Sequence, residues 1–99
     1  MSGGHFDYKY SQILALADEL KHEIDINDDT SIDEYGDTPG HKFKSDALRN
    51  LKIAQRLLSL IGELAKEVEW LYSGDTGEDA FISKIDEITE AFYSALQND

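Results

Sequence analysis

Apolar residues recur at helical spacings in three segments of this chain, and polar stretches separate the segments. Spacings of three and four residues predict helices over about residues 8–26, 46–72 and 77–97. The inward face of the first helix is predicted to carry Tyr10, Ile13, Ala17, Leu20 and Ile24. That of the third is predicted to carry Phe81, Ile85, Ile88, Phe92 and Ala95. The pattern therefore predicts an all-α fold, a three-helix bundle in a single helical domain over residues 1–99.

The middle segment is apolar around much more of its circumference than the other two. Its heptad seam consists of Ala47, Leu51, Ala54, Leu58, Ile61, Ala65, Val68 and Tyr72. Further leucines widen the seam: Leu48, Leu57, Leu64 and Leu71. A helix of this kind lies at the centre of a bundle or is shared between two chains. We therefore expect the bundle to be completed by homo-oligomerisation through the long central helix.

Residues with capping preferences mark the ends of the predicted helices. Asp7 and Ser45 are the predicted N-caps of the first and second helix. Gly74 suits the left-handed position that follows the end of the second helix. Asp75 or Thr76 can cap the third helix, and Thr76 with Asp79 three residues later fits a capping box.

A long polar loop over residues 27–44 joins the first two helices and is rich in acidic residues. A loop of this length in a small domain is either functional or partly disordered. Asp25, Asn27 and Asp29 match the first three ligand positions of a calcium-binding loop, but Gly36 stands where the bidentate glutamate belongs. The loop is therefore expected to be solvated, with an Asn/Asp cap at the helix end and no bound metal.

Composition limits the classes of function open to the chain. Nine basic and 21 acidic residues give a formal net charge of −12, which argues against general binding to nucleic acid or anionic lipid. There is no cysteine, so neither a disulfide framework nor a thiolate metal site is expected. No secretory signal is visible, and no apolar run approaches the roughly 18–20 residues of a membrane span. These features suit a cytoplasmic protein with no membrane partner.

The two signs of charge are not mixed along the sequence. Residues 41–56 carry a net charge of about +4, whereas the rest of the chain carries about −16. The basic residues of this window are Lys42, Lys44, Arg49, Lys52 and Arg56. The last three share one helical face close to a helix N-terminus, where positive charge is unfavourable. The strip is either a site for a phosphate or carboxylate ligand, or a solvated face paired with the chain's own acids.

A dense box of aromatic and polar residues precedes the first helix. Its candidate ligand-binding residues are His5, Phe6, Tyr8 and Tyr10. Aromatic faces stack on bases or pack at an interface, and histidine supplies directional hydrogen bonds. The alternative is a hydrophobic staple that fixes the first helix, with Phe6 and Tyr10 in the core. The two interpretations differ in where these rings lie.

Catalytic motifs are weak. Residues 62–67 partly resemble the all-α nucleotide pyrophosphohydrolases, in which helical carboxylates hold magnesium against a triphosphate. The first two glutamates of that pattern would fall at Ser59 and Leu60, and the later pair at Glu87 and Glu90. Half of the ligand set is therefore missing, and no nucleophile motif such as Gly-x-Ser-x-Gly is present. We expect no catalytic residue and no cofactor.

Two sequence boxes resemble those of a family of small uncharacterised proteins of phages and prophages. The first is Gly4-His5-Phe6-Asp7-Tyr8, followed in the next helix by Ala17-Asp18-Glu19. The second is Trp70-Leu71-x-Ser73-Gly74-Asp75-x-Gly77-Glu78-x-x-Phe81. The resemblance implies a phage origin and residence in the cytoplasm of a bacterial host. It supplies no catalytic residue, because no activity is established for the family.

These features favour a non-enzymatic binding protein, of the kind that phages use against host defences. In one version it sequesters a nucleotide-like signal: the aromatic box stacks on the base, and Arg49, Lys52 and Arg56 hold the phosphates. That version requires the box and the basic strip to converge. The alternative is an inhibitor of a host protein or a DNA mimic, which presents its acidic surface to a nucleic-acid-binding enzyme. A degenerate pyrophosphohydrolase-like protein is the third alternative.

Overall fold

The computed structural model describes residues 4–32 and 34–97, and this part of the chain contains three α-helices and no strand. The helices are α1 (Tyr10–Asp25), α2 (Ser45–Tyr72) and α3 (Glu78–Gln97). The prediction of an all-α, three-helix chain is confirmed. The observed bounds lie within two residues of the predicted ones.

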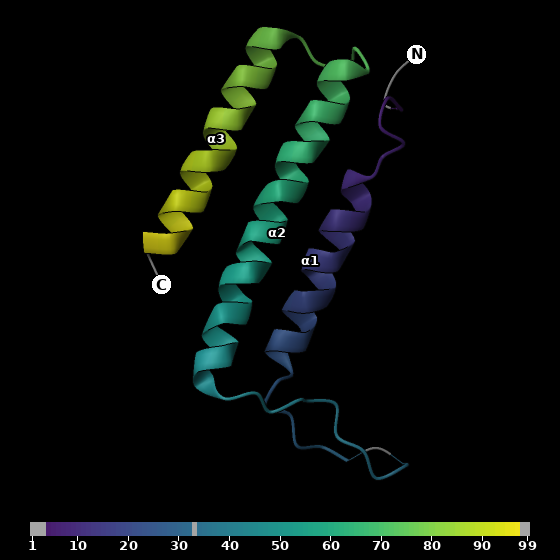
Figure 1. Ribbon diagram of the computed structural model, residues 1–99, viewed down its shortest axis with the longest axis vertical. Coiled ribbons are helices and arrows are strands. Elements are labelled where there is room, and N and C mark those ends of the chain that lie inside the picture. Colours follow the sequence, from purple (N-terminus) through teal and green to yellow (C-terminus); the bar gives the residue numbers. More distant parts are fainter. Residues whose placement is uncertain (1–3, 33, 98–99) are drawn as a thin grey trace.

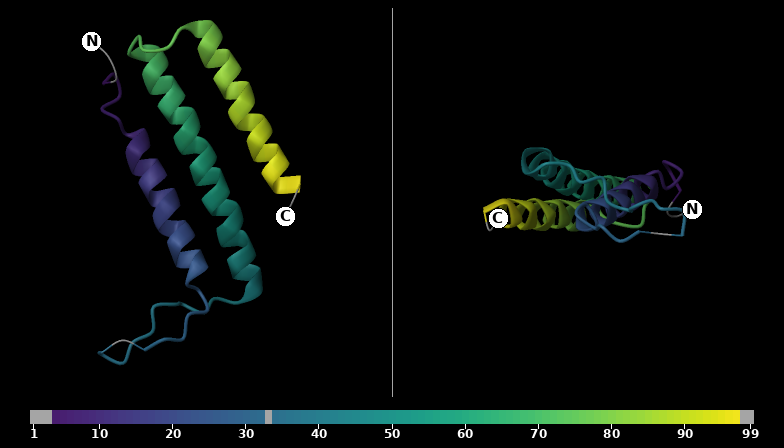
Figure 2. Two further views of the ribbon diagram at one scale, coloured as in Figure 1. Left: turned by 180° about the vertical axis from the view of Figure 1, so that it is seen from behind. Right: turned by 90° about the horizontal axis from the view of Figure 1, so that it is seen from below.

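The three helices lie side by side in a single layer, with α2 in the middle (Figure 1). α1 packs on one side of α2 and α3 on the other, and α1 and α3 do not contact each other over the described residues. The molecule measures 52 × 32 × 14 Å, and its short dimension is visible from below (Figure 2). The bundle is therefore open, and neither neighbour covers the two broad faces of α2.

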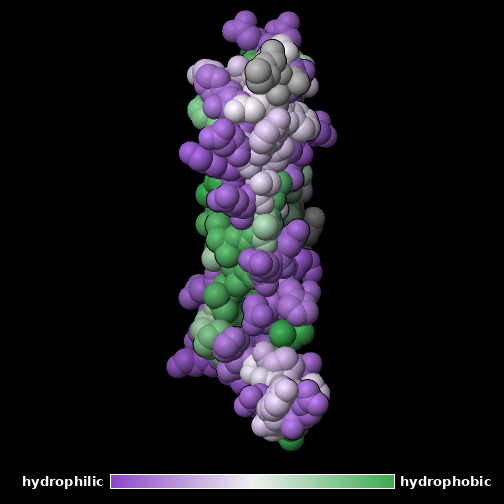
Figure 3. Space-filling view, turned by 90° about the vertical axis from the view of Figure 1, so that its right-hand side faces the viewer, coloured by the Kyte–Doolittle hydropathy of each residue, from purple (hydrophilic) through white to green (hydrophobic). Residues whose placement is uncertain are grey.

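Few apolar residues are fully buried in this layer. Among the described residues Ala17, at 2% exposed, is the only buried hydrophobic residue. Part of the predicted seam of α2 points outward, since Ile61 is 49% exposed and Tyr72 is 63% exposed. The neighbouring helices cover only two sides of α2, so these two residues of the seam remain uncovered within one chain. A band of apolar surface is visible from the α1 edge of the molecule (Figure 3).

A buried glycine lets α1 approach α2 closely. A Cβ atom at Gly62 would lie 2.5 Å from Leu14 Cδ2 and 2.9 Å from Leu14 Cγ, well inside van der Waals contact. A glycine within a helix costs about 1 kcal/mol relative to alanine. That cost is offset here, because the missing side chain leaves room for Leu14 against the backbone of α2.

The N-terminal ends of α1 and α2 differ from the predictions. Asp7 does not cap α1, because it and Tyr8 adopt left-handed backbone conformations with φ of 59° and 57°. Lys9 precedes the helix instead and makes no capping side-chain hydrogen bond. Ser45 is already the first residue of α2, and Lys44 precedes it without a side-chain cap. Both predicted N-caps were therefore wrong.

The turn between α2 and α3 follows the prediction at one end and departs from it at the other. Gly74 has a φ of +83°, so its predicted left-handed conformation is confirmed. The first helical hydrogen bond of α3 runs from Phe81 N–H to Gly77 C=O at 2.9 Å. Gly77 rather than Thr76 therefore occupies the cap position of α3.

The long loop between α1 and α2 is closed at its base by Asn27, which is 3% exposed. Its Nδ2 donates to Phe43 C=O at 3.1 Å, and its Oδ1 accepts from Phe43 N–H at 3.0 Å. Its backbone C=O accepts from Lys42 N–H at 2.9 Å. Asn27 therefore ties the end of α1 to the residues that precede α2, while most of the described loop beyond it is exposed. The loop beyond this base projects from the end of the helical layer (Figure 1).

Candidate functional site

A groove lined by basic side chains lies over α2, between the last turns of α1 and the end of α3. Its volume is about 740 Å³. The lining residues are Lys21, Ile24, Asp25, Arg49, Lys52, Ile53, Gln55, Arg56 and Leu96. The groove thus contains all three basic residues that the sequence places on one face of the second helix. Lys21 adds a fourth cation from α1.

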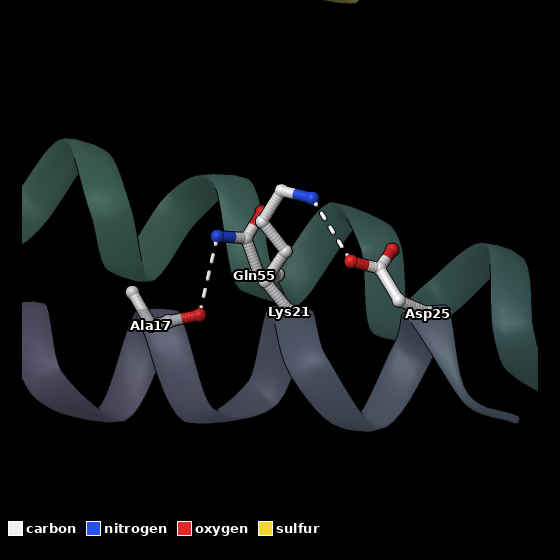
Figure 4. A network of polar contacts seen from close by, with 4 residues as sticks. All are labelled: Ala17, Lys21, Asp25 and Gln55. Atoms are coloured by element: carbon white, nitrogen blue, oxygen red, sulfur yellow. Dashed lines mark hydrogen bonds and ion pairs between the residues drawn. The ribbon is translucent and has the colours of Figure 1, made fainter.

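Polar contacts between α1 and α2 shape the inner wall of the groove. Lys21 leans from α1 toward α2 (Figure 4), and its Nζ lies 3.1 Å from Asp25 Oδ2, one turn further along α1. Gln55 Nε2 donates to the C=O of Ala17 at 3.3 Å and so links the two helices. Asp25 is the single acid among the lining residues. Four cations therefore face one anion in a chain whose net charge is −12.

Two of the basic residues that α2 contributes, Arg49 and Lys52, are at most weakly neutralised by nearby acids. Arg49 lies 3.7 Å from Asp46 on the same helix, and both side chains are largely exposed. An exposed ion pair of this kind contributes at most about 1 kcal/mol. Lys52 makes no ion pair within the part of the chain that the structure describes. The groove therefore keeps positive charge that an anionic ligand could neutralise.

The N-terminal box is bound to the last turn of α2 through Glu69, which is 1% exposed. Its carboxylate oxygens accept hydrogen bonds from Phe6 N–H at 2.7 Å and from Tyr8 N–H at 2.9 Å. Ser73 Oγ accepts from His5 N–H at 3.0 Å and donates to Glu69 Oε2 at 3.3 Å. Backbone N–H groups that converge on one anion in this way form a nest. This docking accounts for the left-handed turn before α1, because the chain must bend sharply to direct both N–H groups at one carboxylate.

The two sequence boxes meet in space, although 63 residues separate Phe6 from Glu69. The rings of His5 and Tyr72 stack with centroids 5.3 Å apart, and Phe6 meets Tyr72 edge-on at 5.5 Å. The Phe6 ring is exposed, so the prediction of a staple with Phe6 in the core was wrong. Tyr10 is half-buried as the first residue of α1. The N–H groups of the box hold Glu69, and its rings form an exposed aromatic cluster.

Glu69 stays ionised because of these contacts. Burial by itself raises the pKa of its carboxyl. The N–H groups of Phe6 and Tyr8, the Ser73 hydroxyl and the nearby His5 lower the pKa by more, so it lies below its usual value. A negative charge in the last turn of a helix is unfavourable. The nest therefore compensates the position of Glu69 at the end of α2.

We expect the docking of the box to weaken as the pH falls. Because the folded-state pKa of Glu69 is lowered, its contribution to stability is present above the ordinary glutamate pKa of about 4.3 and is lost as the pH falls through the lowered value. Glu69→Gln should lower the melting temperature at pH 7, and the difference from the unmodified chain should shrink as the pH falls below the ordinary glutamate pKa and through the lowered one. Thermal melts followed by circular dichroism would measure it. The exposed Glu90→Gln is the control, and an equal pH dependence in both variants would contradict the assignment.

The aromatic cluster and the basic groove lie at opposite ends of α2. Arg56 and Glu69 are thirteen residues apart, which is about 20 Å along a helix at about 1.5 Å per residue. The convergence of the box with Arg49, Lys52 and Arg56, which the nucleotide-binding interpretation requires, is therefore absent within one chain. Each end of α2 carries half of the predicted ligand-binding set.

Several residues that build these two sites gave no clear signal in the sequence. Lys21 and Gln55 enter the groove only because α1 packs beside α2 in this register. Leu96 reaches it from a helix far away in sequence. Glu69 directly precedes the second sequence box, but nothing local indicates that its partners are N–H groups near the N-terminus.

The carboxylates compared with the pyrophosphohydrolases do not gather into a metal site. Glu63 is paired with Lys66 at 3.1 Å, and Glu87 with Lys84 at 3.7 Å. Glu67 is buried, and its Oε2 has no hydrogen-bond partner among the described residues. No group of three or more His, Asp or Glu side chains that could hold a metal ion occurs within residues 4–32 and 34–97.

Comparison with protein-family models, with curated proteins and with solved structures finds no match for this chain. Within the described part of the chain, no helix combines the length and the apolar character that a membrane span requires. We therefore infer the function from the chemistry of the groove and of the aromatic cluster.

Proposed function

We propose that this protein is a non-enzymatic binding protein that holds a small, nucleotide-like anion in the basic groove. The observation that carries the proposal is the gathering of Lys21, Arg49, Lys52 and Arg56 around one groove in a strongly acidic chain. Like charges placed together repel one another, so such a group favours the binding of an anion. Lysine and arginine donate charge-assisted hydrogen bonds to phosphate oxygens.

The size and the walls of the groove support a ligand larger than inorganic phosphate. Its volume of about 740 Å³ lies within the usual range for small-molecule sites, about 300–1,000 Å³. Ile24, Ile53 and Leu96 supply apolar surface for a flat ring, and Gln55 supplies a polar edge. This combination suits a ligand with phosphates at one end and a base at the other.

The resemblance to small phage proteins gives the proposal a biological setting. A phage protein in the bacterial cytoplasm could protect the phage by sequestering a nucleotide signal of the host, and sequestration needs no catalytic residue. The proposal includes assembly into homo-oligomers through α2. The open faces of α2 and the exposure of Ile61 and Tyr72 support this part.

A thermal-shift screen tests the proposal. The probes are a cyclic dinucleotide, an NAD-derived nucleotide and inorganic phosphate. A ligand that binds only the folded chain adds about 2.7 kcal/mol of stability at a concentration 100 times its dissociation constant. We expect at least one nucleotide probe to raise the melting temperature in this way, and phosphate alone to have a smaller effect. Absence of any shift with all probes would overturn the proposal.

The acidic loop favours an inhibitor of a host protein as the second candidate. Beyond its closed base the loop projects from the helical layer (Figure 1), and its Tyr35 and Ile32 are strongly exposed. Aromatic side chains among acids are suited to a basic protein surface. A screen in which no nucleotide stabilises the chain would leave this candidate as the stronger one.

A further inference from the structure

We infer that a second copy of this chain packs antiparallel against the apolar stripe of α2, and that the pairing brings the aromatic cluster of one copy to the basic groove of the other. The apolar stripe runs along one face of α2 and consists of the exposed Ile53, Leu57, Ile61 and Tyr72 and the half-buried Leu64 and Val68. The pairing stands without the proposed binding of an anion. The composite site is the basic groove of one copy completed by the aromatic cluster of the other. It rests on the proposed binding of an anion and adds the residues that would contact the rest of the ligand.

The surface area of the single chain calls for a partner of substantial size. The chain exposes 7108 Å², whereas a compact monomer of 11.2 kDa exposes about 5,700 Å². The excess of about 1,400 Å² per chain, doubled for two copies, falls in the range of permanent dimers, about 2,000–5,000 Å². The radius of gyration of 17.3 Å likewise exceeds the value of about 13 Å for a compact chain of this length.

The single layer of helices also lacks the second layer that a domain normally needs. A stable domain packs at least two layers of secondary structure around a common core. Here the stripe lies on a face of α2 that neither α1 nor α3 covers, and its members Ile53, Leu57 and Ile61 are all exposed. A second copy laid on this stripe supplies the missing layer through a two-fold interface.

The charges along α2 determine the direction of the pairing. Its N-terminal half carries Arg49, Lys52 and Arg56, whereas the exposed acids Asp75, Glu78 and Asp79 follow its C-terminal end. An antiparallel pair places the basic end of each copy beside the acidic end of the other. A parallel pair would place like charges together, which is unfavourable. Antiparallel pairing also opposes the two helix dipoles.

The stripe itself gives the register of the pair. Its ends are Ile53 and Tyr72, so a two-fold axis through its middle passes between Ile61 and Leu64. Ile53 of one copy then lies beside Tyr72 of the partner subunit. Ile53 lines the basic groove, and Tyr72 stacks on His5. The halves of the ligand-binding set that lie about 20 Å apart in one chain thus become neighbours across the interface.

Cysteine cross-linking tests the pairing directly, because the chain has no cysteine of its own. Chains with Ile53→Cys are refolded together with chains carrying Tyr72→Cys and treated with a short bismaleimide. We expect the mixture to give a cross-linked product of two 11.2 kDa chains, and Ile53→Cys alone to give none. Cross-linking of Ile53→Cys with itself would overturn the antiparallel direction. Sedimentation as an 11.2 kDa monomer at all concentrations would overturn the pairing.

A charged residue in the stripe provides an independent measurement. Ile61→Asp is expected to convert the dimer to a monomer by light scattering, whereas Ile32→Asp, in the exposed loop, should leave the mass unchanged. If Ile61→Asp fails to fold, the cross-linking pattern of the cysteine variants decides. A folded Ile61→Asp that keeps the dimer mass would overturn the proposed interface.

The composite site has its own test, made with the nucleotide probe that gives the largest thermal shift. Phe6→Ala should lower the affinity for that probe at least tenfold without changing the dimer mass. The docking of the box is kept, since Glu69 is bound by backbone N–H groups and not by the Phe6 ring. Tyr93→Ala, an exposed ring on α3, is the control. Equal affinity of both variants would overturn the composite site. If no probe binds the unmodified chain, the proposed function and the composite site fail together, while the cross-linking result still decides the pairing.

Discussion

Replacing Asn27 by alanine should lower the free energy of unfolding by about 2–3 kcal/mol and open the loop at its base. The Asn27 side chain makes two hydrogen bonds to the backbone of Phe43, and it is almost completely buried. Each such bond contributes about 0.5–1.5 kcal/mol, and a buried group left without its partner costs more. Water can reach the half-exposed Phe43, which keeps the expected loss near the lower end of that range.

Urea denaturation followed by circular dichroism would measure this loss, and hydrogen exchange at the Phe43 amide would report the opening of the loop. The matched control is Asn50→Ala, since Asn50 is an exposed residue of α2. Its replacement should change the stability by no more than about 0.5 kcal/mol, because the exposed helix position prefers alanine. Equal losses in the two variants would show that Asn27 does not close the loop.

Gly40 also lies at the closed base of the loop, so its replacement tests the same closure. A Cβ atom there would collide with the backbone C=O groups of Ile26 and Asn27, which cannot move aside without opening the loop. We therefore expect Gly40→Ala to destabilise the chain by an amount similar to Asn27→Ala. Thr38→Ala is the control, because Thr38 is an exposed residue of the same loop. A neutral Gly40→Ala would mean that the loop base is looser than these contacts indicate.

The helices could be predicted from the sequence because helical periodicity and turn residues are local signals. Their packing could not, because it depends on how many neighbours the central helix finds. The apolar positions of α2 outnumber what α1 and α3 can cover, so Ile61 and Tyr72 of the seam are exposed within one chain. The same excess of apolar positions had already indicated a partner chain.

The N-terminal caps failed for a different reason. Asp7 has the capping preference expected from its residue type, but the chain around it bends to reach Glu69 in a distant helix. Two strong hydrogen bonds to a buried carboxylate outweigh one cap, which is worth about 1 kcal/mol. A local preference therefore lost to a long-range contact.

The candidate site was predicted in part. Arg49, Lys52 and Arg56 were identified by their spacing on one helical face, and they do line one groove. The contribution of Lys21 depends on the register between α1 and α2, which no local pattern specifies. The distance between this groove and the aromatic box likewise depends on where the N-terminal segment docks, and that is determined by Glu69.

Reversing the charges of Arg49 and Lys52 together should weaken the best nucleotide probe by about 100-fold or more. Each lost charge-assisted hydrogen bond costs about 1.5–3 kcal/mol, and each 1.4 kcal/mol is about a factor of ten in affinity. Arg49→Glu with Lys52→Glu also adds repulsion of the phosphates inside the groove. Isothermal titration calorimetry at fixed ionic strength would measure the affinity, since salt screens these interactions.

The control must separate contact in the groove from the charge of the whole chain. Lys9→Glu with Lys84→Glu changes the net charge equally, but both residues are exposed and neither lines the groove. We expect this control pair to reduce affinity by less than about threefold, because exposed charges farther away than a Debye length of about 8 Å are screened. A similar loss in the two double variants would mean that the probe senses only the overall charge. A loss of affinity confined to the variant of Arg49 and Lys52 would place the phosphates in the groove. The local positive charge would then outweigh the repulsion by the acidic chain as a whole.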